Sequence, residues 1–88
     1  MERYIIELPH TNEECLRALD ETKERARELL PLIDWGCDVG NHKGWVALEA
    51  RSQDEALSKV ESPFLREKAF VCKVVKYTPK QIESFHKM

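Results

Sequence analysis

Three helix-start signals constrain the fold of this chain more than any other feature of its sequence. Each is a capping box, in which Ser or Thr at the N-cap is followed three residues later by Glu or Gln, so that side chains satisfy free backbone N–H groups. The three pairs are Thr11 with Glu14, Ser52 with Glu55, and Thr78 with Gln81. They predict three helices, each of which follows a segment of strand character.

Four such segments are present, and they predict strands at residues 3–8, 35–39, 45–50 and 70–77. The predicted order is βαββαβ plus a short C-terminal helix, which for 88 residues fits one ferredoxin-like α+β domain over residues 1–88. In that plan a four-stranded antiparallel sheet has the order 4-1-3-2 and carries both main helices on one face. We expect the first helix to bury Leu16, Leu19 and Leu30 and to end just before Pro31.

The second face of this sheet is predicted to be too apolar to remain in water. Alternation places Trp45, Ala47, Val71, Val75 and Tyr77 on the side away from the helices. Antiparallel sheets with one solvated face are more polar on that face. A second copy of the chain is the simplest cover, so the sequence predicts a homodimer with two-fold symmetry.

In strand order, length and two-sided strands, the chain resembles the dimeric α+β barrel superfamily over about residues 3–77. Its first strand ends in Pro9-His10-Thr11 and is followed by Glu14-Cys15, which is similar to small uncharacterised members of that superfamily. The resemblance implies a homodimer in which two ferredoxin-like sheets pack face to face. Members include cofactor-free monooxygenases, muconolactone-isomerase-like enzymes, haem-handling enzymes and proteins without known activity, so the resemblance implies no single reaction.

Three charged residues are candidates for catalysis at the centre of the predicted interface. Glu7, Glu49 and Lys73 are assigned to the face away from the helices, where a carboxylate held between two sheets could act as a base. Trp45 and Tyr77 would form the apolar walls of a ligand pocket beside them. The alternative is an interfacial ion pair without chemistry.

A second candidate site lies at one edge of the predicted sheet. The end of the first strand, the start of the first helix and the turn between strands two and three meet there, which brings His10, Cys15 and His42 toward one another. Imidazole and thiolate ligands suit zinc, nickel or copper. The alternatives are a hydrophobic staple of His10 with Cys15, a buried packing role for Cys15, or a reactive Cys15 thiolate at the helix N-terminus.

The remaining cysteines are interpreted as packing residues. Cys37 and Cys72 are assigned to the two edge strands, about 14 Å apart at three sheet spacings, which is too far for a disulfide within one chain. An odd count of three cysteines without a CxxC pair indicates reduced thiols, and with no export signal we expect a cytoplasmic protein.

Charge and hydropathy restrict the partners. A net charge of −2 makes nucleic acid an unexpected partner, and no apolar run approaches the roughly 18 residues that a membrane span needs. The sequence indicates no particular cofactor and does not decide whether the protein is an enzyme. Three hypotheses follow: a homodimeric protein that binds a small ligand between its sheets, a cofactor-free monooxygenase or isomerase that uses Glu7 or Glu49, and a transition-metal-binding protein.

Overall fold

The computed structural model describes residues 1–87, which form an α+β domain with a four-stranded antiparallel sheet. The strands are β1 (Glu2–Pro9), β2 (Asp34–Trp35), β3 (Lys43–Ala50) and β4 (Phe70–Val74). The α-helices are α1 (Cys15–Arg25), α2 (Gln53–Ser58), α3 (Pro63–Arg66) and α4 (Pro79–His86). Three short 3-10 helices are η1 (Asn12–Glu14), η2 (Leu30–Leu32) and η3 (Cys37–Val39).

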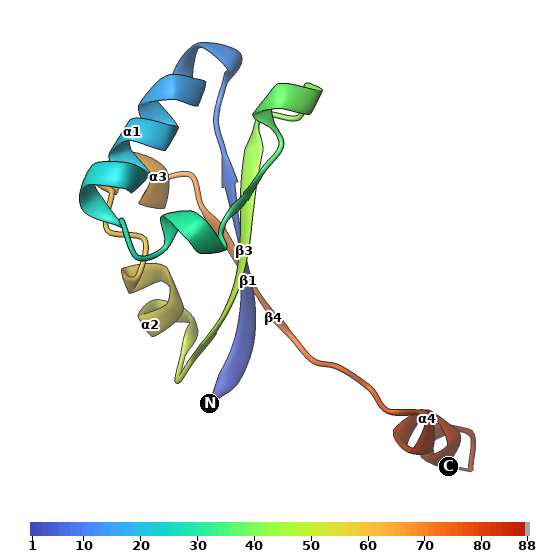
Figure 1. Ribbon diagram of the computed structural model, residues 1–88. Helices are drawn as coiled ribbons and strands as arrows, with labels where there is room; N and C mark the ends of the chain where they lie inside the picture. The colour runs from blue at the N-terminus through green and yellow to red at the C-terminus, as the bar shows by residue number, and fades with distance from the viewer. Residues whose placement is uncertain (88) are drawn as a thin grey trace.

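The strands lie in the order β2-β3-β1-β4, which gives the same neighbours as the expected order when it is read from the opposite edge. Around it, the elements are interleaved differently from the plain six-element plan. The short strand β2 has two residues, and the second helix is divided into α2 and α3 before Pro63, whose ring cannot continue a helix. Helices α1, α2 and α3 lie on one side of the sheet (Figure 1).

The hydrophobic core lies between the sheet and the helices α1, α2 and α3 that cover one of its faces. Ile6 and Leu8 of β1 are fully buried, and Ala18, Val60 and Leu65 from the covering segments are at most 2% exposed. On α1 the buried positions are Ala18 and Thr22. The small Ala18 allows the helix to approach the sheet closely, and the hydroxyl of Thr22 is satisfied by a hydrogen bond of 2.8 Å to the Ala18 carbonyl.

The predicted helical stripe was therefore wrong in part. Leu16 is 69% exposed, and α1 ends at Arg25, several residues before Pro31. The helix turns its small residues inward and leaves Leu16 outside. Beyond it, Ala26, the C-cap of α1, and Leu29, in the turn that follows, are buried without a continued helix.

The pairing of β4 corrects the prediction for the face away from the helices, which we call the open face. Residues Ile6 and Val71 pair in register, and Tyr4 pairs with Lys73, so Val71 and Lys73 share the helix-covered side with buried β1 residues. The open face instead carries Phe70, Cys72 and Val74 from β4, beside Ile5 of β1 and Ala47 of β3. Alternation along the sequence could not decide which set of β4 side chains faces the helices, because both sets contain apolar residues.

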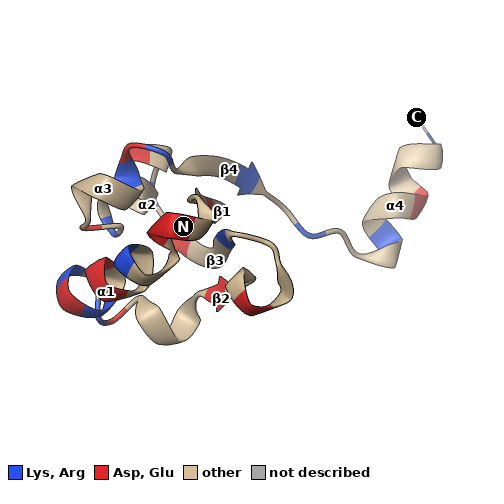
Figure 2. Cartoon of the chain, turned by 90° about the horizontal axis from the view of Figure 1, so that it is seen from above, with Lys and Arg blue, Asp and Glu red and all other residues tan. Residues whose placement is uncertain are grey.

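The C-terminal segment leaves the domain body. Beyond Val74 the chain runs extended to α4, which lies apart from the sheet and from the other helices (Figures 1 and 2). Val75 and Tyr77, expected in the fourth strand, belong to this segment and are about 60% exposed. The ring of Tyr77 packs edge-on against Phe85 of α4 at 5.5 Å. No helix within residues 1–87 is long and apolar enough to cross a membrane.

Candidate metal centre

Four side chains with metal-binding atoms converge at one end of the sheet. His10 follows β1, Cys15 begins α1, Cys37 begins η3 and His42 immediately precedes β3. One candidate ligand atom from each lies within 4.8 Å of every other. The backbone N–H of His10 donates to the His42 carbonyl at 3.1 Å, which joins the two halves of the cluster beyond the last paired residues of β1 and β3.

The side chains form a continuous chain of contacts. The Cys15 thiol donates to Cys37 Sγ at 3.1 Å, while Cys15 Sγ also contacts His42 Nδ1 at 3.1 Å. Cys37 Sγ contacts His10 Nε2 at 3.0 Å. A tetrahedral zinc ion, with Zn–S of about 2.3 Å and Zn–N of about 2.0–2.1 Å, separates its ligand atoms by about 3.3–3.8 Å. The three direct contacts in the cluster, at 3.0–3.1 Å, are slightly shorter than this ligand spacing. The other separations between the four candidate ligand atoms reach at most 4.8 Å, which is somewhat longer. Small side-chain rotations would therefore bring the four atoms to the corners of a tetrahedron.

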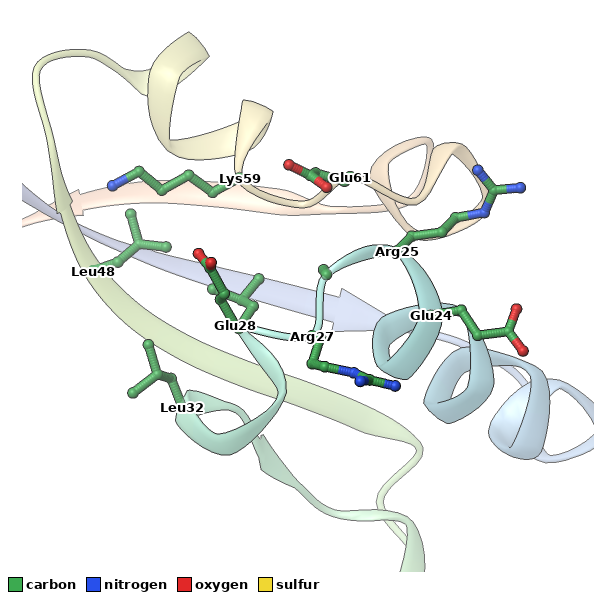
Figure 3. Close-up of a pocket in the computed structure, with 10 residues that line it drawn as sticks. Glu24, Arg25, Arg27, Glu28, Leu32, Leu48, Lys59 and Glu61 are labelled. Carbon is green, nitrogen blue, oxygen red and sulfur yellow. The ribbon is translucent and has the colours of Figure 1, made fainter.

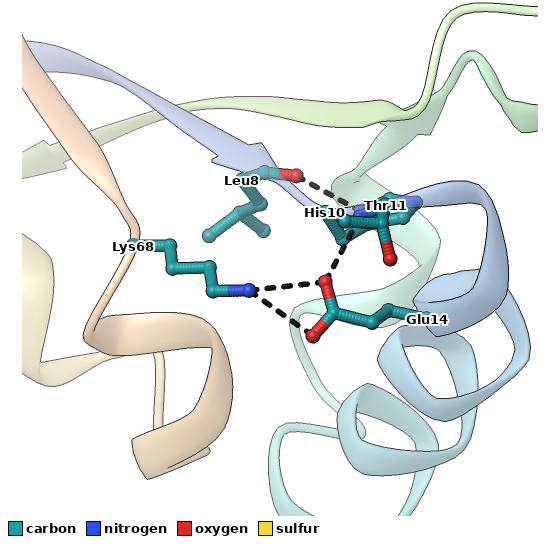
Figure 4. A network of polar contacts seen from close by, with 5 residues as sticks. All are labelled: Leu8, His10, Thr11, Glu14 and Lys68. Carbon is teal, nitrogen blue, oxygen red and sulfur yellow. Dashed lines mark hydrogen bonds and ion pairs between the residues drawn. The ribbon is translucent and has the colours of Figure 1, made fainter.

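The first helix is anchored by a polar network that places Cys15. The Glu14 carboxylate accepts a hydrogen bond of 2.9 Å from the Thr11 backbone N–H, as the capping box predicts. Lys68, which follows α3, donates to both oxygens of the same carboxylate at 3.0 Å (Figure 4). Hydrogen bonds to the ionised form, first from Thr11 and then from Lys68, lower the pKa of Glu14 to about 2.

The other half of the cluster is held by a compact turn. The Gly36 N–H donates to the Lys43 carbonyl, and the Asn41 N–H donates back to the Gly36 carbonyl, both at 2.9 Å. A Cβ at Gly36 would lie 2.5 Å from the Asn41 carbonyl oxygen, so this close approach requires glycine. Gly40 closes η3 with φ of +84°, a backbone conformation that glycine adopts without strain.

Outer contacts orient His10. Its ring is buried, and Nδ1 lies 3.2 Å from the Leu8 carbonyl oxygen (Figure 4). An N–H at Nδ1 that donates to this carbonyl leaves the lone pair of Nε2 directed at Cys37, which is the arrangement that metal-ligating histidines use. The centroid of the Trp35 ring lies 6.0 Å from that of the His10 ring, and the two rings are tilted by 55°.

The pairing of the thiols affects their protonation. Burial, followed by the close contact with Cys15, raises the pKa of the Cys37 thiol to about 11. Cys37 is therefore protonated at neutral pH, and its proton can be donated to His10 Nε2. A divalent cation would reverse this balance, because metal binding favours the thiolate.

The structure thus brings the three predicted residues His10, Cys15 and His42 together and adds Cys37. The sequence interpretation missed Cys37 because it assigned that residue to an edge strand as a packing residue, whereas β2 ends at Trp35 and Cys37 lies in η3. A usable signal was present in the spacing. His10 precedes Cys15 by five residues, and Cys37 precedes His42 by five residues, so each half of the cluster contributes one His and one Cys.

The predicted catalytic and pocket residues do not form one site. The Glu7 carboxylate forms an ion pair with Lys43 at 2.8 Å, whereas Lys73 pairs with Glu2 at 2.7 Å on the opposite, helix-covered side of the sheet. Glu49 is exposed. Trp45 lies on the open face, but Tyr77 lies beyond β4 and contacts Phe85, so these two side chains do not enclose a common pocket.

A hollow of about 580 Å³ lies elsewhere, between the end of α1 and the segment that follows α2. Leu32 and Leu48 contribute apolar surface, and charged side chains of both signs, including Glu28 and Lys59, surround it (Figure 3). It does not include the cluster or the predicted catalytic residues. The comparisons with known proteins find no matching family model, curated protein or solved structure.

Proposed function

We propose that this protein binds a transition-metal ion, foremost zinc, through His10, Cys15, Cys37 and His42. The observation that supports it is the convergence of two imidazole nitrogens and two thiol sulfurs from four separate segments within 4.8 Å. Two His and two Cys form a common ligand set of structural zinc sites.

The chemistry of the site favours a structural role over a catalytic one. Four protein ligands fill the tetrahedral positions of zinc, whereas catalytic zinc sites retain one position for water or substrate. A bound ion would join the connection between β1 and α1 to the turn between η3 and β3. Because zinc binding at such sites contributes to folding free energy, the ion would stabilise a domain whose core is small.

Zinc titration of protein purified without a histidine tag tests this proposal. We expect one zinc ion per chain and a higher melting temperature in the presence of zinc. Cys37→Ser removes a ligand and should lose both effects, whereas Cys72→Ser should retain them because Cys72 lies on the open face of β4. Absence of bound zinc at micromolar supply in correctly folded, reduced protein would overturn the proposal.

We also propose that the fold is of the ferredoxin-like class, similar to the dimeric α+β barrel type, and that two copies associate through their open faces. Apolar residues Ile5 and Phe70 on that face are exposed. Charges support a two-fold arrangement, since Arg3 and Glu7 lie two residues to either side of Ile5 on β1. An axis that crosses the strands at Ile5 brings Arg3 of each copy opposite Glu7 of the other. Sedimentation of the full chain should give a dimer at micromolar concentration, and a monomer would contradict this proposal.

A further inference from the structure

The two thiols of the candidate metal centre lie unusually close for cysteines that are 22 residues apart in the chain. Their Sγ atoms are 3.1 Å from each other, and both side chains are partly buried. A disulfide has an S–S distance of about 2.05 Å, so the sulfurs need to approach by only about 1 Å.

We propose that Cys15 and Cys37 form a reversible disulfide, and that this disulfide and the metal ion exclude each other. The metal centre would then be controlled by the thiol–disulfide balance of its surroundings. This inference deepens the proposed function and rests on it for the metal, while the closeness of the two sulfurs supports the disulfide independently.

The local structure permits the required movement. Cys15 is held in the first turn of α1, but Cys37 lies in a single 3-10 turn that ends at Gly40 and is fixed mainly by turn hydrogen bonds. His10 Nε2 and His42 Nδ1 flank the pair of sulfurs from either side. After oxidation these two imidazoles would remain as the only ligands of the set, too few for the tetrahedral site.

A low-molecular-weight disulfide, such as glutathione disulfide, is the oxidant class that this step requires. One protein thiolate attacks a sulfur of the oxidant, which forms a mixed disulfide and releases one glutathione thiolate. The second protein thiolate then attacks the protein sulfur and expels the other glutathione thiolate. The two cysteines lose two electrons, the oxidant gains them, and a zinc ion bound by both thiolates leaves as Zn²⁺ without a change in oxidation state.

The third cysteine provides an internal reference. Cys72 is exposed on β4 and lies outside the cluster, with its Sγ 3.6 Å from the Lys73 carbonyl oxygen. If exposure alone decided oxidation, Cys72 would react first and would carry glutathione as a mixed disulfide. Oxidation that is directed by the cluster leaves Cys72 as the remaining free thiol.

The experiment treats the tag-free, metal-depleted full chain with one equivalent of glutathione disulfide, followed by alkylation of free thiols, peptide mapping by mass spectrometry and zinc titration. We expect a Cys15–Cys37 disulfide, alkylation at Cys72, and zinc stoichiometry that falls from one to near zero and recovers with dithiothreitol. Zinc added before the oxidant should slow the reaction. The variants Cys15→Ser and Cys72→Ser serve as a matched pair, because only the second retains the proposed disulfide.

The outcomes separate the two proposals. Reduced protein that binds zinc but forms no Cys15–Cys37 disulfide would overturn this inference and leave the metal site standing. Oxidised protein that contains the disulfide and still binds one zinc would overturn the mutual exclusion. A disulfide in protein whose reduced form binds no zinc would refute the proposed function, and with it the redox control of metal binding.

Discussion

Glu14 shows how a single half-buried carboxylate can link local helix structure to the rest of the domain. It accepts the Thr11 N–H at the start of α1 and pairs with Lys68 from a distant segment. Its pKa is lowered to about 2 because both contacts favour the ionised form. The folded protein therefore holds this proton less tightly than the unfolded chain, whose carboxyl titrates near the ordinary value of 4.5.

This difference predicts how stability depends on pH. The contribution of Glu14 is fully present above about pH 4.5 and is lost as the pH falls toward about 2. Glu14→Gln should lower the melting temperature near pH 6 and flatten its decline between pH 5 and pH 2. Thermal melts across that range measure both effects. Glu13→Gln, at an exposed position in the same turn, is the control, and an equal flattening in it would contradict the assignment to Glu14.

The candidate ligands illustrate what sequence reasoning could resolve at this scale. The meeting of His10, Cys15 and His42 followed from topology, because the end of the first strand and the turn before the third lie at one edge of the sheet. Cys37 could not be placed in the same way. Its assignment depended on where β2 ends, and strand boundaries are weakly encoded when a two-residue pairing leads directly into a turn.

At the scale of elements, the turn from Gly36 to His42 determines whether the two halves of the metal centre match. Gly36 lies so close to the Asn41 carbonyl that an added Cβ must displace the backbone. Cys37 directly follows this position, so a displacement there is passed to a proposed ligand. Gly40 differs, because a Cβ there meets no atom within 4 Å and only its φ of +84° is demanding.

We therefore expect Gly36→Ala to weaken zinc affinity by at least about tenfold, which corresponds to roughly 1.4 kcal/mol. Gly40→Asn is the matched control, because Asn tolerates positive φ better than other residues with side chains. Competition titration with a chromogenic zinc chelator measures both affinities. Equal losses in the two variants would mean that backbone flexibility, and not the close approach at Gly36, controls the site.

The positions at which helices begin were more predictable from the sequence than the faces that they bury. The N-caps Ser52 and Thr78 precede α2 and α4 as expected, since local hydrogen bonds alone decide them. Thr78 forms the complete capping box with Gln81, whereas at Ser52 only the N-cap half forms, because the Glu55 carboxylate accepts from the Arg51 N–H. The buried face of α1 depended instead on tertiary packing. There the small Ala18 and the internally bonded Thr22 face the sheet, although leucines at other positions are more hydrophobic.

At the scale of the whole molecule, six of the ten exposed large apolar side chains in the described residues lie on the open face or in the C-terminal segment. This group comprises Ile5, Phe70, Val75, Tyr77, Ile82 and Phe85. In Figure 1, α4 stands apart from the body on the open-face side of the sheet, so it would meet a second copy docked there. The proposed dimer can therefore cover two surfaces that a single chain leaves in water.

A dimer of this kind depends on both surfaces. We expect Phe70→Glu on the open face to raise the dimer dissociation constant at least about tenfold, because each two-fold contact would bury the new charge twice. The double variant Ile82→Glu and Phe85→Glu should have a similar effect if α4 contacts the second copy. Leu32→Glu is the control, since Leu32 is as exposed as Phe70, at 60% against 65%, but follows α1 on the helix side.

Analytical ultracentrifugation over a concentration series compares the variants. A normal dimer in the α4 variant together with a weakened dimer in Phe70→Glu would restrict the interface to the sheet, whereas equal weakening by Leu32→Glu would remove the case for the open face.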